Sequence, residues 1–380
     1  MMKRVPLDKY CEKKIETLQK NYIGLIDYID ISAVDNEEKR IISYQTIDSK
    51  DAPSRAKQLI KKNDILVSTV RPNLNAVAVI ENETDNLMVA STGYCVLRCK
   101  DDADVRYMFN FCQSPYFIED MTTQATGASY PAVSTSIVKS SLIPYYSIEE
   151  QHEIAKKIDA VSNLIALRKQ QFSKLDELVK SRFIETFGDP VSNDKGWPHQ
   201  AMDKVAPSSA CSGDSSERVW LLNLDMVEAQ TGRIIDYLYV DKAEVGTSTC
   251  GFDEGNVLYS KLRPYLNKVV VPTKKGYCTT ELVPLRPNVK LNRQFLAFLL
   301  RSDSFVSFIN EKVAGAKMPR VSMNVFREFE CILPPIDLQN EFATFVEQVD
   351  KSKLAIQNSL EKLEMLKKSL MQKYFGRGKS

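Results

Sequence analysis

Apolar residues recur every three or four positions along two long stretches of the chain. This spacing places one apolar stripe on a helix, and its persistence over about four to five heptads is typical of a coiled coil. Neither stretch contains glycine or proline before Gly188 or Gly376, which suit helix ends. The apolar positions are Ile154, Ile158, Val161, Ile165, Phe172, Leu175 and Val179 in the first stretch, and Phe342, Val346, Val349, Ile356, Leu360, Leu363 and Leu370 in the second.

We therefore predict two long helices, over residues 148–188 and 337–380. At a rise of 1.5 Å per residue, a helix of about 37 residues is roughly 55 Å long, which is enough to hold two domains a fixed distance apart. The length of the apolar stripe favours pairing of the two helices as an antiparallel coiled coil. The alternative is that each helix packs only on its own globular domain.

The segment before each long helix carries a different pattern. Short apolar runs rich in β-branched residues, bounded by proline, asparagine and glycine, predict strands at 65–70, 76–80 and 94–98. A helical pattern follows at 105–114 and recurs at 293–302. The expected fold class is therefore α+β, with two α/β domains in tandem.

The two halves of the chain are copies of one unit. The segment DILVSTVRPNLN (64–75) matches NVLYSKLRPYLN (256–267), and ATGASYPAVS (125–134) matches VAGAKMPRVS (313–322). Five landmark pairs share one offset of 188 positions: Thr92 and Thr280, Gly127 and Gly315, Pro131 and Pro319, Gln151 and Gln339, Gly188 and Gly376. The duplication predicts four parts in order: a first domain over 1–147, a spacer helix over 148–188, a second domain over 189–336 and a C-terminal spacer helix over 337–380.

Composition narrows the class of protein only slightly. The 380 residues carry a net charge of +2, so that any nucleic-acid surface has to be a local basic patch. No apolar signal-like run opens the chain and no stretch of about 18 apolar residues occurs, which predicts a cytoplasmic protein with no membrane partner. The eight cysteines are scattered without a CxxC pair, and we expect reduced, mostly buried thiols.

Several catalytic signatures are missing from the sequence. Histidine occurs only twice, and neither His152 nor His199 lies near a cysteine or carboxylate cluster with metal-ligand spacing. The phosphate-binding patterns GxGxxG and GxxxxGK[ST] are absent, as is the [ND]PP[YF] motif expected of a methyltransferase acting on a flipped base. We expect no metal site, no bound cofactor and no catalysis by this chain alone.

The first candidate DNA-binding element is the turn that follows a predicted strand in each copy. Arginine can form two hydrogen bonds to guanine, asparagine can do the same to adenine, and lysine binds phosphate. The alternative is an ordinary strand-end turn with a solvated arginine. The candidate residues are Arg71, Asn73 and Asn75 in the first copy, and Lys261, Arg263, Tyr265 and Asn267 in the second.

The second candidate element is the glycine-containing loop. Small residues let the backbone approach a ligand closely, and the longer side chains here can reach phosphates or bases. A plain connector between two helices is the alternative. The candidates are Thr126, Gly127, Ser129 and Tyr130 in the first copy, and Gly315, Lys317 and Arg320 in the second. Frame residues match between the copies whereas projecting residues differ, as one scaffold that reads two sequences requires, although drift on a solvated surface gives the same pattern.

The chain resembles the specificity subunits of type I restriction–modification systems along essentially its whole length. The resemblance is carried by the RPNLN and RPYLN turns, by the glycine loops that lead into IPYYSIEEQ and LPPIDLQNEF, and by the long helices that end in FGDP (187–190) and YFG (374–376). It implies that each globular domain is a target-recognition domain reading one half of a bipartite, asymmetric double-stranded DNA site. It implies further that the paired helices set the gap between the halves.

The same resemblance implies partners and assigns the cofactors to them. Two methyltransferase subunits would dock on the helices and supply S-adenosylmethionine, and restriction subunits would bring ATP with Mg²⁺. Two other hypotheses stay open on the residues alone. One is a duplicated scaffold that assembles other proteins through its coiled coil, and the other is a self-sufficient enzyme with a cryptic site.

Overall fold

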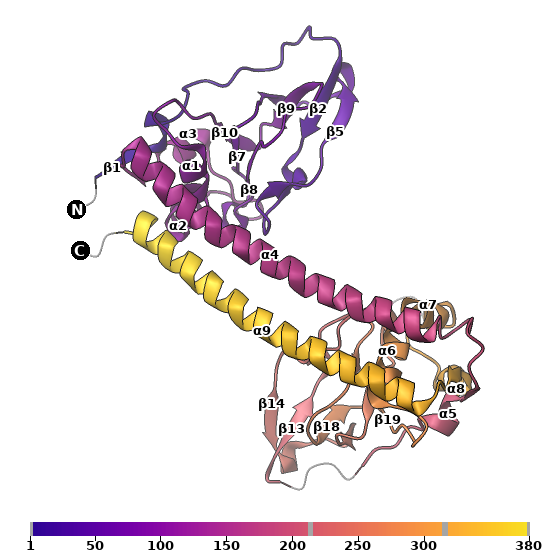
Figure 1. Cartoon of the computed structure of the whole chain (residues 1–380). Helices are drawn as coiled ribbons and strands as arrows, with labels where there is room; N and C mark the ends of the chain where they lie inside the picture. The colour runs from indigo at the N-terminus through magenta and orange to yellow at the C-terminus, as the bar shows by residue number, and fades with distance from the viewer. Residues whose placement is uncertain (1–2, 212–215, 314–317, 378–380) are drawn as a thin grey trace. The chain divides into compact units, whose positions relative to one another are not determined.

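A computed structural model of the chain describes residues 3–211, 216–313 and 318–377 (Figure 1). The chain divides into two compact units. Unit 1 comprises Met1–Lys169 and Asn358–Ser380, and unit 2 comprises Gln170–Gln357. The predicted long helices are α4 (Ile148–Phe187) and α9 (Ile336–Phe375), and each contributes residues to both units.

Unit 1 holds a four-stranded sheet in the order β5-β2-β9-β6 and a three-stranded sheet in the order β10-β7-β8. In the larger sheet β2 and β9 are parallel and the outer strands are antiparallel to them. The strands are β2 (Leu25–Ile29), β5 (Gln45–Asp48), β6 (Ala56–Leu59), β7 (Ile65–Ser68), β8 (Val77–Val79), β9 (Leu87–Ser91) and β10 (Tyr94–Leu97). The strands predicted at 65–70, 76–80 and 94–98 are thereby confirmed as β7, β8 and β10.

Two small pairs and three short helices complete unit 1. The pairs are β1 (Arg4–Pro6) with β11 (Leu142–Pro144), and β3 (Val34–Asp35) with β4 (Arg40–Ile41). The helices are α1 (Val105–Cys112), α2 (Pro115–Gln124) and α3 (Thr135–Ser140). Each begins after a polar residue whose side chain accepts a hydrogen bond from a first-turn N–H group, a capping interaction that defines the helix start: Asp104, Ser114 and Ser134.

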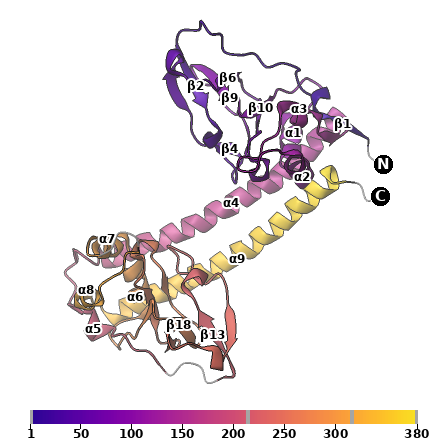
Figure 2. The ribbon, with the colours of Figure 1, turned by 180° about the vertical axis from the view of Figure 1, so that it is seen from behind.

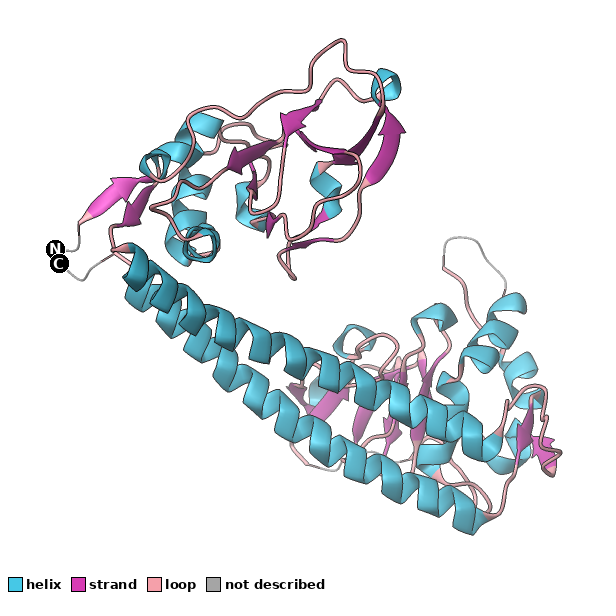
Figure 3. Ribbon diagram, turned by 45° about the horizontal axis from the view of Figure 1, so that its top comes forward, coloured by secondary structure: helices cyan, strands magenta, loops and turns pink. Residues whose placement is uncertain are grey.

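Unit 2 repeats this architecture, with strands and short helices mixed in the same way (Figure 3). Its sheets have the orders β14-β13-β18-β15 and β17-β16-β19, and β12 pairs with β20. The strands are β12 (His199–Ala201), β13 (Arg218–Leu222), β14 (Leu238–Asp241), β15 (Thr249–Phe252), β16 (Val257–Ser260), β17 (Val269–Val270), β18 (Gly276–Thr279), β19 (Leu282–Leu285) and β20 (Glu330–Ile332). The short helices are α5 (Met202–Val205), α6 (Arg293–Arg301), α7 (Asp303–Glu311) and α8 (Met323–Glu328).

The structure confirms the duplication element by element. The helices predicted at 105–114 and 293–302 are α1 and α6, and they begin 188 positions apart. The same offset separates α3 from α8, β10 from β19, and β11 from β20. It also separates both ends of α4 from those of α9. One sequence repeat therefore encodes one structural repeat.

The long helices pair in antiparallel fashion within each unit. In unit 1 the first part of α4 lies beside the last part of α9 in both views (Figures 1 and 2). In unit 2 the last part of α4 lies beside the first part of α9. The core residues shared at these contacts are Ile154, Ile158, Met371 and Phe375 in unit 1, and Val179, Phe183, Phe342 and Val346 in unit 2.

The predicted antiparallel pairing is thus confirmed, and the alternative, in which each helix packs only on its own domain, is wrong. Each unit buries the start of one long helix together with the end of the other. None of the helices in the described part of the chain combines the length and the apolar character needed to cross a membrane.

The ends of the long helices are fixed as the glycines predicted. Gly188 follows α4 with a φ of +73°, a left-handed conformation that glycine adopts without strain. Its N–H donates to the Ile184 carbonyl at 2.8 Å, and the N–H of Gly376 donates in the same way at the end of α9. The last carbonyl of α4 accepts from Trp197 Nε1 at 2.9 Å, and that of α9 accepts from Arg4 at 2.8 Å.

A buried glutamine locks the start of each long helix to its unit. Gln339 is fully buried in α9, accepts from the backbone N–H of Asn292 at 2.9 Å, and donates to the carbonyls of Lys290 and Pro334. Gln151, its counterpart in α4, makes the equivalent bonds to Asp104, Asp102 and Tyr146. The repeated glutamine in the sequence therefore marks a structural joint.

Replacing Gln339 with leucine is expected to lower the free energy of unfolding by about 1–3 kcal/mol, because it leaves one part-buried N–H and two carbonyls without their partner. Gln348→Leu, at an exposed position of the same helix, is the matched control and should stay within about 0.5 kcal/mol of wild type. Urea-induced unfolding measures both. Equal effects would show that the joint contributes no stability.

Candidate nucleic-acid interface

The predicted turn of the first copy follows β7 as a single 3-10 turn, Pro72–Leu74. Its two flanking residues adopt the left-handed conformation, with φ of 48° at Arg71 and 50° at Asn75. Asparagine tolerates this region, but it costs an arginine roughly 1–2 kcal/mol. Backbone strain of this kind persists where the surroundings enforce it, and it is found disproportionately at functional sites.

The second copy reproduces this geometry after β16. Pro264–Leu266 forms the 3-10 turn, and φ is 49° at Arg263 and 50° at Asn267. The proline is buried in both copies, whereas Arg71 and Arg263 are exposed. The strained backbone therefore directs an arginine side chain into solvent at the same place in each unit.

The structure joins this turn to the glycine loop, although the two lie about 60 residues apart. The backbone N–H of Arg71 donates to the Pro131 carbonyl at 2.7 Å, and Val133 N–H donates to the Thr69 carbonyl at 2.9 Å. In the second copy Arg263 donates to Pro319 at 2.8 Å, and Val321 donates to Lys261 at 2.9 Å. The two candidate elements thus form one surface in each unit.

The two asparagines of these turns point inward. Asn75 is buried, and its Nδ2 donates to the Cys112 carbonyl at 2.8 Å while its Oδ1 accepts from Lys39 Nζ at 3.0 Å. Asn267 is also buried and donates to the Arg301 carbonyl at 2.9 Å. Both amide nitrogens donate within their own unit and hold the end of the turn, whereas the Asn267 Oδ1 is buried without a hydrogen-bond partner among the described residues.

In the first copy the remaining candidates are exposed. The Arg71 guanidinium lies 4.8 Å from the ring centroid of Tyr130, a cation–π contact that pairs the two loops through their side chains. Gly127 has a φ of +104°, and a Cβ there would approach the Tyr130 carbonyl to 2.9 Å, so the loop requires glycine. Asn73, Thr126 and Ser129 are exposed beside them.

In the second copy the exposed side chains differ. Arg263 and Tyr265 face solvent, Lys261 is half-buried, and Arg320 donates to Glu281 at 2.7 Å. Gly315 and Lys317 lie outside the described residues. At described positions, unit 2 thus has the exposed Met318 where unit 1 has Tyr130, and Arg320 where unit 1 has Ala132.

Two cations near these turns had no signal in the sequence. Lys39 Nζ donates to the Asn75 carbonyl at 2.6 Å in unit 1, and in unit 2 the Arg301 guanidinium donates to the carbonyl of Val269, two residues beyond the turn. Nothing in the local sequence indicates either, because Lys39 stands in a charged run and Arg301 ends an amphipathic helix. Only the fold brings them to the turn.

Within the described residues, no group of three or more histidine, cysteine, aspartate or glutamate side chains is arranged to hold a metal ion. The eight cysteines are free thiols, and five of them are buried: Cys11, Cys95, Cys112, Cys278 and Cys331. Burial raises the pKa of Cys331 to about 12, which keeps that thiol protonated.

Comparison with known proteins gives consistent matches. The family model "Type I restriction modification DNA specificity domain" matches residues 8–177 and 230–366. The EcoDI specificity subunit of Escherichia coli is 27% identical over 153 residues, which are 39% of this chain and 34% of that subunit. The MjaIX specificity subunit of Methanocaldococcus jannaschii is 20% identical over 347 residues, covering 83% of this chain and 77% of the relative.

Solved structures share the fold. A chain from a type I R-M system superposes with a TM-score of 0.62 at 24% identity, covering 99% of this chain and 97% of the other. The type I restriction–modification S subunit from M. genitalium gives a TM-score of 0.58 at 16% identity, covering 100% and 97%. Because the family model matches both copies and most of the sequence, this chain belongs to the family of type I restriction modification DNA specificity domains.

Proposed function

We propose that this chain is the sequence-specific DNA-recognition subunit of a type I restriction–modification complex. Residues 1–147 and 189–336 act as target-recognition domains, and each reads one half of a bipartite double-stranded DNA site. The helices over 148–188 and 337–380 set the gap between the two halves. The chain is non-catalytic and provides specificity to its partners.

One observation carries this proposal. Both units tie a strained arginine turn to a second loop through the same backbone hydrogen bonds, from Arg71 to Pro131 and from Arg263 to Pro319. The framework is equal in the two copies, whereas the exposed side chains on it differ. Two frameworks with different exposed groups suit two different half-sites, because base edges are distinguished by the side chains presented to them.

The candidate residues divide by their surroundings. Thr126 and Gly127 shape the glycine loop, with Gly315 at the equivalent place in the second copy. Asn75 and Asn267 hold the turns from inside, so that we assign no DNA contact to them. The proposed DNA contacts are Arg71, Asn73, Ser129 and Tyr130 in the first domain, and Lys261, Arg263, Tyr265, Lys317 and Arg320 in the second.

The partners follow from the same proposal. Two methyltransferase subunits dock on the paired helices and carry S-adenosylmethionine, and restriction subunits carry ATP with Mg²⁺. This chain holds no cofactor of its own, and because its ligand is the cell's DNA, the complex acts in the cytoplasm. Its net charge of +2 predicts weak DNA binding by the isolated chain, and the partner subunits supply further DNA contacts.

Mapping methylated adenines across a genome tests the proposal, with this chain co-expressed with its methyltransferase subunit. We expect one motif in two parts with a fixed unspecified gap. Exchanging residues 1–147 for those of a relative should change only one part. Methylation at a continuous site, or no methylation, would contradict the proposal that two domains recognise two half-sites. Sequence-independent DNA binding would favour the alternative hypothesis of a duplicated scaffold that assembles other proteins.

Arg71→Gly should remove one base contact without damaging the fold, because glycine adopts the φ of 48° more readily than arginine. We expect unchanged or slightly higher thermal stability, and a loss of about 1–3 kcal/mol in discrimination at one position of a single half-site. Binding to duplexes varied at each position measures this loss. Arg263→Gly is the matched control and should affect only the other half-site. Equal loss at both half-sites would argue against separate reading.

A further inference from the structure

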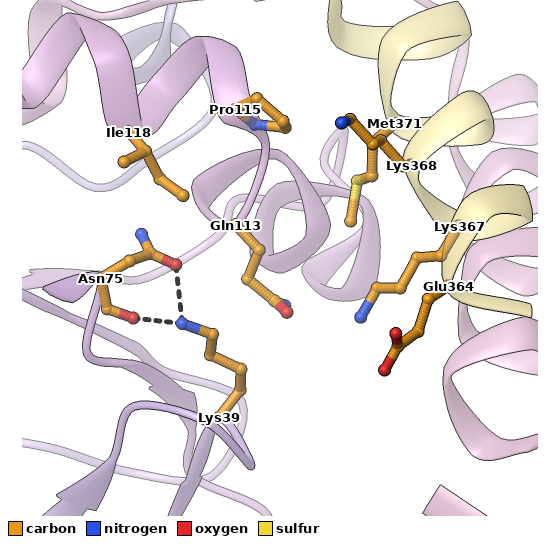
Figure 4. Close-up of a pocket in the computed structure, with 9 residues that line it drawn as sticks. All are labelled: Lys39, Asn75, Gln113, Pro115, Ile118, Glu364, Lys367, Lys368 and Met371. Carbon is orange, nitrogen blue, oxygen red and sulfur yellow. Dashed lines mark hydrogen bonds between the residues drawn. The ribbon is translucent and has the colours of Figure 1, made fainter. Parts of the chain in front are cut away.

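A pocket of about 320 Å³ opens in unit 1 beside the arginine turn (Figure 4). It lies between the β3–β4 turn, the end of the arginine turn and the last part of α9. The charged groups that line it are Lys39, Glu364, Lys367 and Lys368. The lining thus holds three lysines against one carboxylate, and Lys39 and Lys367 are the two lysines that are partly buried.

Lys39 and Lys367 approach the pocket from opposite sides. Figure 4 shows the Lys39 side chain extending from the β3–β4 turn toward Asn75. The Lys367 side chain extends from α9 toward the side of the pocket that holds Lys39 and Asn75. Lys39 Nζ donates to the Asn75 carbonyl at 2.6 Å and to its Oδ1 at 3.0 Å, which fixes the ammonium at the pocket wall. Glu364 lies beside Lys367 on the same helix.

The positive charge of this pocket is poorly balanced by its own unit. Burial, followed by repulsion from Lys367, lowers the pKa of Lys39 to about 8 against the opposing charge of Asp35, and burial also lowers the pKa of Lys367. Asp159 opposes the second shift, but its two oxygens accept from Arg106 at 2.7 Å and from Asn110 at 2.8 Å. Lysines that face each other in a partly buried site favour an anionic ligand.

In the second copy the Arg301 side chain occupies the corresponding place. Gly232 occupies the position of Lys39: its φ is +67° against +57°, and its N–H donates to the residue four earlier, as that of Lys39 does. A Cβ at Gly232 would collide with the Val269 carbonyl and with the Arg301 guanidinium. Arg301 stands 188 positions after Gln113, which lines the pocket in unit 1.

The charge in the second copy is also balanced by carboxylates of its own unit. Burial lowers the pKa of Arg301 to about 10, Asp350 and Asp176 oppose that shift, and Asp176 accepts from Lys353. By the offset of 188, the counterparts of the two aspartates in unit 1 are Ser162 and Glu364. At these two positions unit 1 therefore has one carboxylate fewer than unit 2, and it has an open, lysine-lined space where unit 2 places the Arg301 side chain.

We propose that the Lys39–Lys367 pocket binds a phosphate group of the DNA backbone. This inference rests on the proposed function and adds to it a phosphate anchor in the first domain. Lysine binds phosphate as a point charge, and such contacts fix the position of a protein on the duplex without reading its sequence. The anchor adjoins the Arg71–Asn75 turn, because Lys39 bonds directly to the last residue of that turn.

The test measures binding of the assembled complex to a duplex carrying its mapped motif and to a scrambled duplex, between 50 and about 300 mM salt. Lys39→Met and Lys367→Met should each weaken binding roughly tenfold, as the loss of one charge-assisted hydrogen bond does. The slope of log K against log salt should fall by about 0.9, and the ratio between the two duplexes should stay unchanged. Lys362→Met, at an exposed position of α9 outside the pocket, is the control and should leave both values unchanged.

The outcomes separate the two proposals. If the wild-type complex does not distinguish the duplexes, the proposed function fails. If it does distinguish them and both variants bind with wild-type affinity and slope, only the phosphate anchor is overturned. A third outcome would assign the pocket to free phosphate and overturn the DNA backbone as the source of the phosphate. In that outcome inorganic phosphate raises the thermal stability of the wild-type complex but not that of Lys367→Met, and Lys367→Met binds DNA as the wild type does. Lys367→Arg, which keeps the charge, should retain DNA affinity.

Discussion

Replacing Phe187 with alanine is expected to lower the free energy of unfolding of unit 2 by about 3–5 kcal/mol, the usual cost of deleting a fully packed phenyl ring. The ring is completely buried at the end of α4. Its centroid lies 4.7 Å from that of Phe295 and 5.5 Å from that of Phe342, both in edge-to-face geometry. The side chain therefore joins the end of one long helix to α6 and to the start of the other long helix.

The matched control is Leu178→Ala, on the same helix and in the same unit. Leu178 is 48% exposed, and its truncation should change the free energy of unfolding by no more than about 0.5 kcal/mol. Urea unfolding followed by tryptophan fluorescence reports on unit 2, which contains Trp197 and Trp220. Equal destabilisation by the two substitutions would mean that the aromatic cluster does not hold the helix end.

The long helices were predictable because their signal is redundant. Each carries an apolar position every three or four residues over many turns, and the repeat shows the pattern twice. Phe187 and Phe375 were visible as a repeated Phe-Gly pair, but the sequence does not show that each packs into the unit where the other helix begins. The apolar stripe predicts the antiparallel pairing, but the core that each helix end enters depends on contacts with residues remote in sequence.

The four-stranded sheets were not predicted, and their sequences show why. The strand β2 (Leu25–Ile29) carries a buried aspartate, Asp27, in the middle of an otherwise apolar run. Hydrogen bonds from Thr46 Oγ1 at 2.6 Å and from Asn86 satisfy it, and both donors are distant in sequence. A polar residue that is buried with remote partners breaks the alternation on which strand prediction relies.

The candidate site was predictable in its parts but not in its assembly. The arginine turns and glycine loops were found from repeated proline, glycine and arginine, whereas the backbone bonds that join them link residues about 60 positions apart. Asn75 and Asn267 had the chemistry of base-reading residues, yet the left-handed backbone turns their amides inward. The polarity of a residue does not show whether its side chain points inward or into solvent. Nothing in the sequence around Lys39 indicates that it contacts the turn.

Asp64→Ala should be as costly to unit 1, at about 3–5 kcal/mol, because it removes the buried carboxylate that binds the Arg98 guanidinium and leaves that group only the Leu59 carbonyl and a Glu12 oxygen 3.9 Å away. Asp64 is 1% exposed, and its two carboxylate oxygens accept from Arg98 Nε at 2.9 Å and from the same guanidinium at 2.7 Å. The second copy has an uncharged residue at the position of Asp64. There Asn256, 192 positions later, donates to the carbonyls of Ser209 and Leu285.

A double substitution separates the cost of the unpaired arginine from the contribution of the buried ion pair. The double substitution Asp64→Leu with Arg98→Met removes both charges, and it should recover most of the stability that Asp64→Ala alone loses. Glu38→Ala breaks an ion pair with Arg40 in which both side chains are more than half exposed, and it should cost no more than about 1 kcal/mol. Urea unfolding of the three variants measures these differences. If Asp64→Ala cost no more than Glu38→Ala, the buried pair would contribute nothing to unit 1; if only the double variant were stable, the penalty would lie in the orphaned arginine.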